Sequence, residues 1–177
     1  MFPGHMKRLL FQMLAIACAA TSVCAQPALR PLPLDKANVL PLALDDSFQF
    51  RKQILRLQDP QVENSFQHPS LMFERARTNF GAVNQYDRQQ RFGHYFTFFW
   101  RAQRAADLTV RLEYRQEKLG SHVQAQELHY DNAKGSYKTH FNVIGDDYNQ
   151  EGRVTAWRVI LIEKGKIVAL NQSFLWN

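Results

Sequence analysis

Residues 93–177 contain no proline, and six of the chain's eight glycines lie there between apolar runs. This pattern constrains the fold most, because proline is kept off central strands and glycine is common in the turns between strands. Six strands fit the pattern, at about 94–103, 107–116, 121–130, 136–144, 153–163 and 166–176. The region therefore predicts an antiparallel sheet with short connections.

Aromatic side chains crowd the first of these strands. Alternation places Phe98 and Trp100 on one face, and a hairpin turn at 104–106 would set them opposite Leu112 and Val110. Aromatic residues at strand spacing usually pack in a core. We therefore expect the even-numbered positions of both strands to be buried.

The odd-numbered face of the same hairpin carries Tyr95 and Phe99. The predicted register sets Tyr95 opposite Arg115 and Phe99 opposite Arg111. Arginine side chains over aromatic rings give cation–π contacts of roughly 0.5–1 kcal/mol. We expect these two rings to be sheltered by arginine.

The last hairpin has the clearest turn signal. Two apolar runs flank Lys164-Gly165, which predicts a two-residue turn with Ile162 opposite Ile167. The same register sets Leu161 opposite Val168 and Trp157 opposite Gln172. Both faces of this hairpin are apolar near the turn, so both need cover, and we expect residues 45–92 to cover one of them.

Residues 1–25 have the pattern of a secretory signal peptide. Lys7 and Arg8 precede an apolar run, and Val23 and Ala25 occupy the positions that a signal peptidase reads, which predicts cleavage after Ala25. The alternatives are an uncleaved membrane anchor and a lipid-modified Cys18. We expect the protein to be secreted or periplasmic.

The segment before the predicted sheet divides in two. Residues 26–44 contain four of the seven prolines and predict an extended leader. Residues 45–92 predict a partly helical segment packed on the sheet, with a short helix that begins after Asp46 and a second segment capped by Ser70 that is either helix or strand. A turn of helix or a loop follows Tyr86.

Composition excludes several classes of function. Both cysteines lie within residues 1–25, so the processed chain has no thiolate metal site, cysteine nucleophile or disulfide. Its remaining charge is spread along the sequence, which argues against a nucleic-acid partner. The sequence has no G-x-S-x-G, P-loop, G-x-G-x-x-G or H-E-x-x-H motif.

One patch has metal-binding residue types. A turn at 131–136 would gather Glu127, His129 and His140 on the polar face of a hairpin, where they could bind a metal or move protons. Their spacing matches no established ligand motif, and a solvated hairpin face has the same composition. They are weak candidates for a metal site.

Three stretches, GHYFTFFWRA, LTVRLEYRQ and AWRVILIEKGKIVALNQSFLW, resemble those of uncharacterised secreted bacterial proteins. The span 93–176 is also similar in size and strand spacing to β-sandwich domains of the immunoglobulin or fibronectin-III type, although it lacks their paired cysteines. The resemblance implies a mainly β protein whose residues 93–177 form an antiparallel immunoglobulin-like sandwich. It implies no activity, because such sandwiches have many functions.

These observations favour a non-enzymatic binding or assembly module of the cell envelope, with a protein or glycan partner and no cofactor. The alternatives are a carbohydrate-binding module and a metal-dependent enzyme that uses the patch above. Contact with a membrane is expected only through the signal segment, if it is retained. The candidate ligand-binding residues are the aromatics Tyr95, Phe99, Tyr148 and Trp157.

Overall fold

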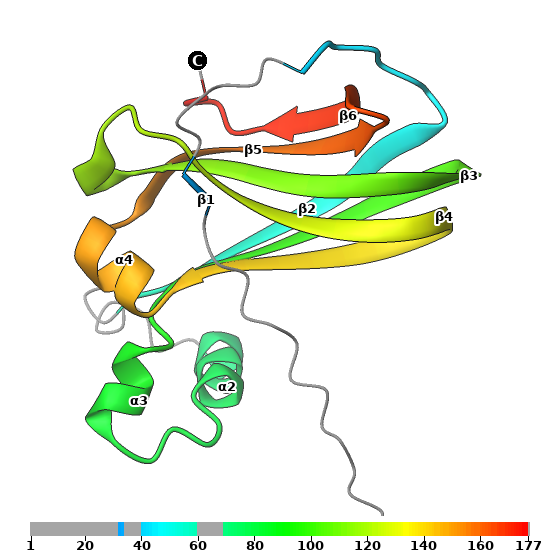
Figure 1. Cartoon of the computed structure of the whole chain (residues 1–177). Coiled ribbons are helices and arrows are strands. Elements are labelled where there is room, and N and C mark those ends of the chain that lie inside the picture. Colours follow the sequence, from blue (N-terminus) through cyan, green and yellow to red (C-terminus); the bar gives the residue numbers. More distant parts are fainter. Residues whose placement is uncertain (1–31, 34–39, 60–68, 177) are drawn as a thin grey trace, which may run out of the picture.

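The computed structural model describes residues 32–33, 40–59 and 69–176, so the predicted signal peptide lies outside the described residues. The fold is mainly antiparallel β, as predicted (Figure 1). Its elements are β1 (Leu32–Pro33), β2 (Phe48–Gln58), α2 (Pro69–Thr78), α3 (Gln85–Gln89), β3 (Gly93–Gln116), a 3₁₀ turn (Glu117–Leu119), β4 (Gln124–Ile144), α4 (Asp146–Glu151), β5 (Val154–Glu163) and β6 (Lys166–Gln172). Within the described part of the chain, no helix is long and apolar enough to cross a membrane.

Two long strands, β3 and β4, form the centre of the sheet where four shorter strands were predicted. The predicted turn at 104–106 is wrong: β3 continues through it, with Ala102 paired to Gly135 and Ala106 paired to Ala133. No glycine or proline stops the strand there, and β-bulges absorb the unequal numbers of residues.

The predicted turn at 131–136 is also wrong, although Gly135 lies in it. β4 runs through it, and the register shifts between the pairs Ala106–Ala133 and Leu108–Tyr130. Asn132 lies in this bulge with a φ of 48°. Before this bulge the even-numbered side chains of β4, such as Gln126, point to the core, and after it the odd-numbered ones do, such as Phe141.

The sheet curls into a half-barrel because β3 has different neighbours along its length. β4 follows one edge of β3 throughout, whereas the other edge pairs with β2 over 93–102 and with β5 over 109–116. We call β2 with residues 93–102 and 135–144 the β2 half, and the rest of the sheet the β5 half. The predicted immunoglobulin-like sandwich is not confirmed, because one continuous sheet supplies both walls (Figure 1).

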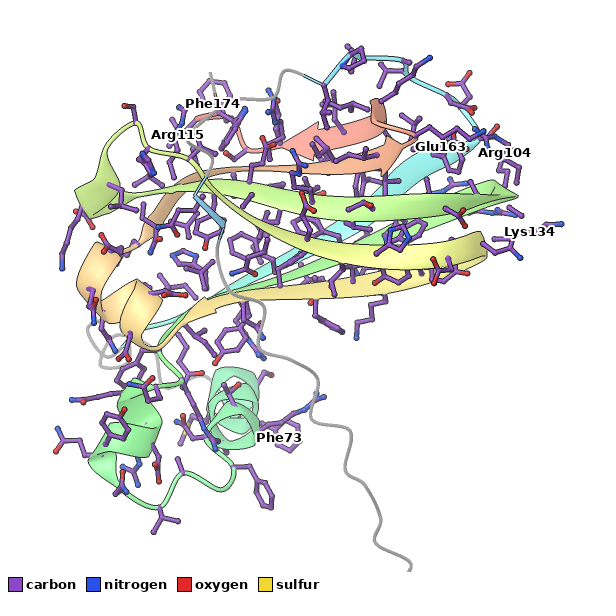
Figure 2. All side chains as sticks on the ribbon, viewed as in Figure 1. Phe73, Arg104, Arg115, Lys134, Glu163 and Phe174 are labelled. Atoms are coloured by element: carbon purple, nitrogen blue, oxygen red, sulfur yellow. The ribbon has the colours of Figure 1, made fainter. Side chains whose placement is uncertain are left out.

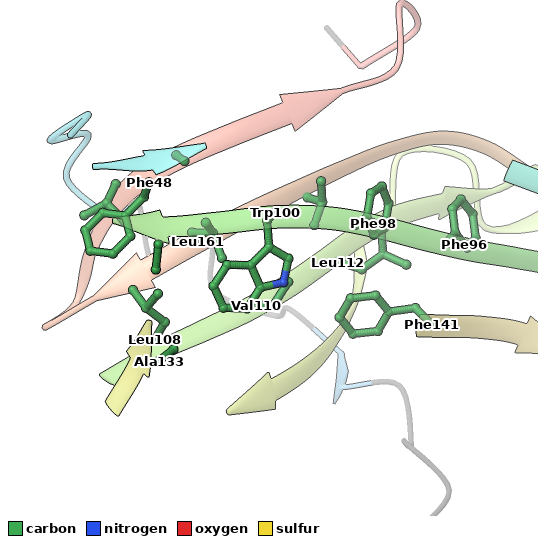
Figure 3. Packing of buried hydrophobic residues seen from close by; sticks show 14 of the residues in the cluster. Phe48, Phe96, Phe98, Trp100, Leu108, Val110, Leu112, Ala133, Phe141 and Leu161 are labelled. Atoms are coloured by element: carbon green, nitrogen blue, oxygen red, sulfur yellow. The ribbon is translucent and has the colours of Figure 1, made fainter. Parts of the chain in front are cut away.

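The core lies between the two walls of the half-barrel (Figure 3). The predicted even face of β3 is confirmed: Phe96, Phe98 and Trp100 are at most 2% exposed. The predicted partners are wrong, because Trp100 pairs with Phe50 and Tyr137. Strand alternation therefore identified the buried side chains without identifying their neighbours.

The short helix expected after Asp46 is wrong, since these residues form β2. Phe48 of this strand is buried in the core, and Phe50 packs against the core from a partly buried position. The apolar spacing fits a helix, but the free edge of β3 offers backbone hydrogen bonds and a core to cover. Tertiary pairing therefore overrides the local pattern.

The last hairpin has the predicted turn. Glu163 pairs with Lys166 and Ile162 with Ile167, and both turn residues, Lys164 and Gly165, have positive φ, as a type I′ turn requires. Beyond the turn a register shift makes the other two predicted pairs wrong. Ala169 replaces Val168 opposite Leu161, and Arg158 replaces Trp157 opposite Gln172.

Both faces of this hairpin are covered, as predicted. Val159 and Leu161 point into the main core, and Ile160 and Ile162 form a second cluster on the outer side. Leu40 packs on that outer cluster, so part of its cover comes from the predicted leader and not from 45–92.

Candidate functional site: a basic face on the β2 half

The outer side of the β2 half gathers side chains from three strands. Alternation along paired strands determines which residues share this surface. We call it the basic face, and its members are Gln49, Lys52, Ile54 and Arg56 of β2, Tyr95, Thr97, Phe99 and Arg101 of β3, and Ser136, Lys138, His140 and Asn142 of β4.

Three of the four cations on this surface have no acidic partner among the described residues. None of its twelve strand positions is Asp or Glu. Among the described residues, no carboxylate lies within ion-pair distance of Lys52, Arg101 or Lys138, and all three side chains are exposed. Unpaired cations on one surface attract anionic ligands over several ångströms.

The outer side of the β5 half is different, because its charges neutralise one another. Arg111 pairs with Glu127 and with Glu113, and Arg158 also pairs with Glu113. Trp176 then packs over this ladder, with the guanidinium carbon of Arg158 5.0 Å from its ring centroid. The two outer surfaces of the sheet therefore differ in charge: these two arginines of the β5 half pair with carboxylates, whereas Lys52, Arg101 and Lys138 of the basic face have no such partner within the described ranges.

Tyr95 and Phe99, two of the candidate ligand-binding residues, lie on the basic face. The cation–π contacts predicted for them exist with different partners: Arg56 lies 5.0 Å from the Tyr95 ring and Lys138 lies 5.8 Å from the Phe99 ring. Arg115, expected beside Tyr95, lies instead on the β5 half. The Tyr95 hydroxyl is fixed by a 2.7 Å hydrogen bond to the Arg91 carbonyl oxygen.

A groove of about 620 Å³ runs across the basic face. Its walls include Arg56, Tyr95, Lys138 and His140, and Arg77 reaches it from α2. Burial, and then the positive charge of Lys138, lower the pKa of His140 below its usual value. The groove therefore combines cations, the imidazole of His140 and the ring of Tyr95.

The weak metal candidates are not brought together. Because β4 is continuous, His129 and His140 lie on different halves of the same strand. His129 contacts Thr109, His140 contacts Thr97, and Glu127 pairs with Arg111. Within the described ranges, no group of three histidine, cysteine or acidic side chains is arranged to bind a metal ion.

The other two aromatic candidates lie away from solvent. Trp157 is 8% exposed and packs against Phe98 in the core. Tyr148 is also 8% exposed, on α4, where its hydroxyl donates a 2.8 Å hydrogen bond to Asp59. Neither ring is available as a stacking platform.

A second polar cluster surrounds Tyr148. Its hydroxyl and the Arg153 guanidinium both contact Oδ2 of the buried Asp59, and the His94 ring lies 6.0 Å from the Tyr148 ring. Burial raises the pKa of Tyr148 to about 12 and, with the charge of Arg153, lowers that of His94 to about 4. The cluster ties the end of β2 to α4.

Comparisons of the chain with protein-family models, curated proteins and solved structures find no match. The functional argument therefore depends on the chemistry of the molecule's own surfaces.

Sequence reasoning found the two aromatic residues of the basic face but missed its cations. Lys52, Arg101 and Lys138 are far apart in the chain and meet only when β2 and β4 pair with opposite edges of β3. No local signal marks this surface, because the stretch from Lys52 to Arg56 does not alternate polar and apolar side chains.

Proposed function

We propose that the protein is a non-enzymatic binding module of the cell envelope that uses the basic face to bind an anionic glycan. The observation that supports this proposal is the gathering of four cations and two aromatic rings on one sheet surface that has no carboxylate. The proposal combines the expected envelope location with the expected glycan partner.

The chemistry of the face suits an acidic sugar polymer. Arginine and lysine pair with carboxylate or phosphate groups, and arginine does so with two parallel hydrogen bonds. Aromatic rings supply apolar area with a defined orientation against which a sugar ring can pack. A groove across paired strands matches the extended shape of a polymer better than a closed pocket does.

Binding of a uronic-acid polysaccharide to the processed protein tests this function. We expect binding that weakens as salt is added, with a neutral glucan as the comparison ligand, because exposed charges are screened over roughly 10 Å at 0.1 M ionic strength. Lys52→Glu combined with Lys138→Glu should weaken binding at least tenfold, about 1.4 kcal/mol. Fluorescence anisotropy of the labelled polymer measures this.

The matched control is Lys164→Glu combined with Lys166→Glu. It makes the same change of charge at exposed positions of the β5–β6 turn. It should leave affinity within about twofold, roughly 0.4 kcal/mol. Equal losses in both double variants would show that net charge alone attracts the polymer, and tighter binding to duplex DNA would assign the face to nucleic acid instead.

The metal-dependent alternative has no comparable support. Its three residues each have a separate partner, and two of them lie on opposite halves of the sheet. A site of that kind requires ligands that converge on one point.

A further inference from the structure

An ordered apolar projection lies beside the basic face. The helices α2 and α3 extend away from the sheet, and residues 79–84 connect them (Figure 1). On this connection Phe80 is 86% exposed and Val83 is 88% exposed. We call residues 79–84 the apolar tip. Phe73 of α2 (Figure 2) and Tyr86 of α3 are also exposed.

The backbone of the apolar tip is held in place although its side chains face solvent. The Arg91 guanidinium donates hydrogen bonds to the carbonyl oxygens of Thr78 and Phe80. A capping box between Asn84 and Asp87 fixes the start of α3, and Asp87 also accepts from the amide of Val83. A loop whose backbone is fixed while its large apolar side chains remain in water is typical of an interaction surface.

The charge around the tip indicates the kind of surface. Residues 69–92 contain four arginines against Glu74 and Asp87, a net charge of +2. Arg77 and Arg88 are exposed, and Arg77 also lines the groove of the basic face. Apolar side chains surrounded by arginines complement a partner that has anionic groups at its surface and an apolar interior.

A lipid bilayer with anionic headgroups has both properties. Phenylalanine and valine partition into the acyl boundary, tyrosine favours the headgroup level, and arginine pairs with lipid phosphates. A folded protein partner would also cover the apolar groups, but the arginines beside the tip favour the bilayer, because lipid phosphates attract them.

We propose that the apolar tip inserts into the surface of an anionic bilayer, with Phe80 and Val83 in the acyl boundary and Arg77 and Arg88 at the phosphates. This inference concerns a surface other than the basic face and does not depend on glycan binding.

Co-sedimentation of the processed protein with vesicles tests the inference. We expect binding to vesicles of phosphatidylcholine with about one third phosphatidylglycerol, and little binding to phosphatidylcholine alone, because anionic headgroups attract the arginines. Phe80→Ser combined with Val83→Ser should reduce the bound fraction at least tenfold. Both side chains are exposed, so the fold should persist.

The matched control is Phe174→Ser combined with Leu175→Ser. These side chains are 93% and 65% exposed, and Figure 2 shows Phe174 and Phe73 at opposite ends of the molecule. The control should bind vesicles as the unchanged protein does. Failure of the unchanged protein to bind anionic vesicles, or equal loss in the two double variants, would overturn the inference.

Three further measurements strengthen the test. Phe80→Trp should give a blue-shifted emission component when anionic vesicles are added, and an unshifted spectrum contradicts insertion. Sedimentation equilibrium without lipid should give the same mass for the unchanged protein and the tip variant; a dimer that the tip variant loses would assign the surface to a second copy. Lys52→Glu with Lys138→Glu should retain vesicle binding, which separates this inference from the proposed glycan site.

Discussion

At the scale of single residues, His94 has the most unusual environment. Its ring stacks on Phe96 and lies close to Tyr148, and its Nε2 atom has no hydrogen-bond partner among the described residues. Burial is the main cause of its lowered pKa of about 4, and the positive charge of Arg153 adds to it. The folded protein therefore keeps this imidazole neutral at pH values at which an exposed histidine begins to gain a proton.

This environment predicts a pH dependence of stability. Between pH 6.5 and about 4 the unfolded chain binds a proton at His94 that the folded chain does not. The free energy of unfolding should therefore fall as the pH is lowered through this window, by about 3 kcal/mol in total. Urea unfolding at pH 7 and pH 4.5 measures this. The free energy of unfolding of His94→Phe should fall less between the two pH values than that of the unchanged protein, and equal falls would contradict the prediction.

At the scale of elements, the β3–β4 pair depends on close backbone approach at one end. Gly93 has a φ of 140°, and a Cβ atom there would lie 2.1 Å from the Val143 carbonyl oxygen. Glycine is required at this position because the paired backbone of β4 occupies the space of a side chain.

Gly93→Ala should therefore lower the free energy of unfolding by more than about 3 kcal/mol, since backbone must move. The control is Gly165→Ala in the β5–β6 turn. There φ is also positive, at 73°, but nothing lies within 4 Å of the added atom. That change should cost roughly 1–2 kcal/mol from conformation alone. Urea unfolding measures the loss of stability in both variants. Equal losses would show that the β4 backbone moves away from the added Cβ atom without a free-energy cost.

At the scale of the whole molecule, β2 makes the N-terminal segment part of the core. It pairs with β3 over 93–102 and buries Phe48 between the walls. A buried aromatic of this size contributes roughly 1.5–3 kcal/mol, and its removal also exposes neighbouring rings.

A chain that begins at Arg91 should therefore aggregate or bind a hydrophobic dye, because it lacks β2. A chain that begins at Leu40 retains β2 and Leu40 itself, and should unfold cooperatively without binding dye. Dye fluorescence and thermal unfolding measure the difference. A soluble, monomeric 93–177 fragment as heat-stable as the chain that begins at Leu40 would show that β2 is dispensable.

Local pattern was sufficient for the features that depend on neighbouring residues. Alternation identified the buried face of β3, from Phe96 to Trp100, because side chains in any strand point to opposite sides in turn. The Lys164-Gly165 turn was also predictable, since two adjacent residues with positive φ favour glycine and a two-residue loop. Neither feature requires knowledge of the partner strand.

The sequence by itself thus determined that the protein is mainly antiparallel β, which side chains of β3 are buried, and where the final hairpin turns. Only the tertiary structure decided that β3 and β4 continue through the predicted turns, that 48–58 is a strand, and that the sheet closes into a half-barrel. It also decided the basic face, where Lys52, Phe99 and Lys138 are adjacent. The physical reason is that strand pairing joins residues some 40 positions apart, and the hydrogen bonds and burial it provides outweigh the local preferences that a short stretch expresses.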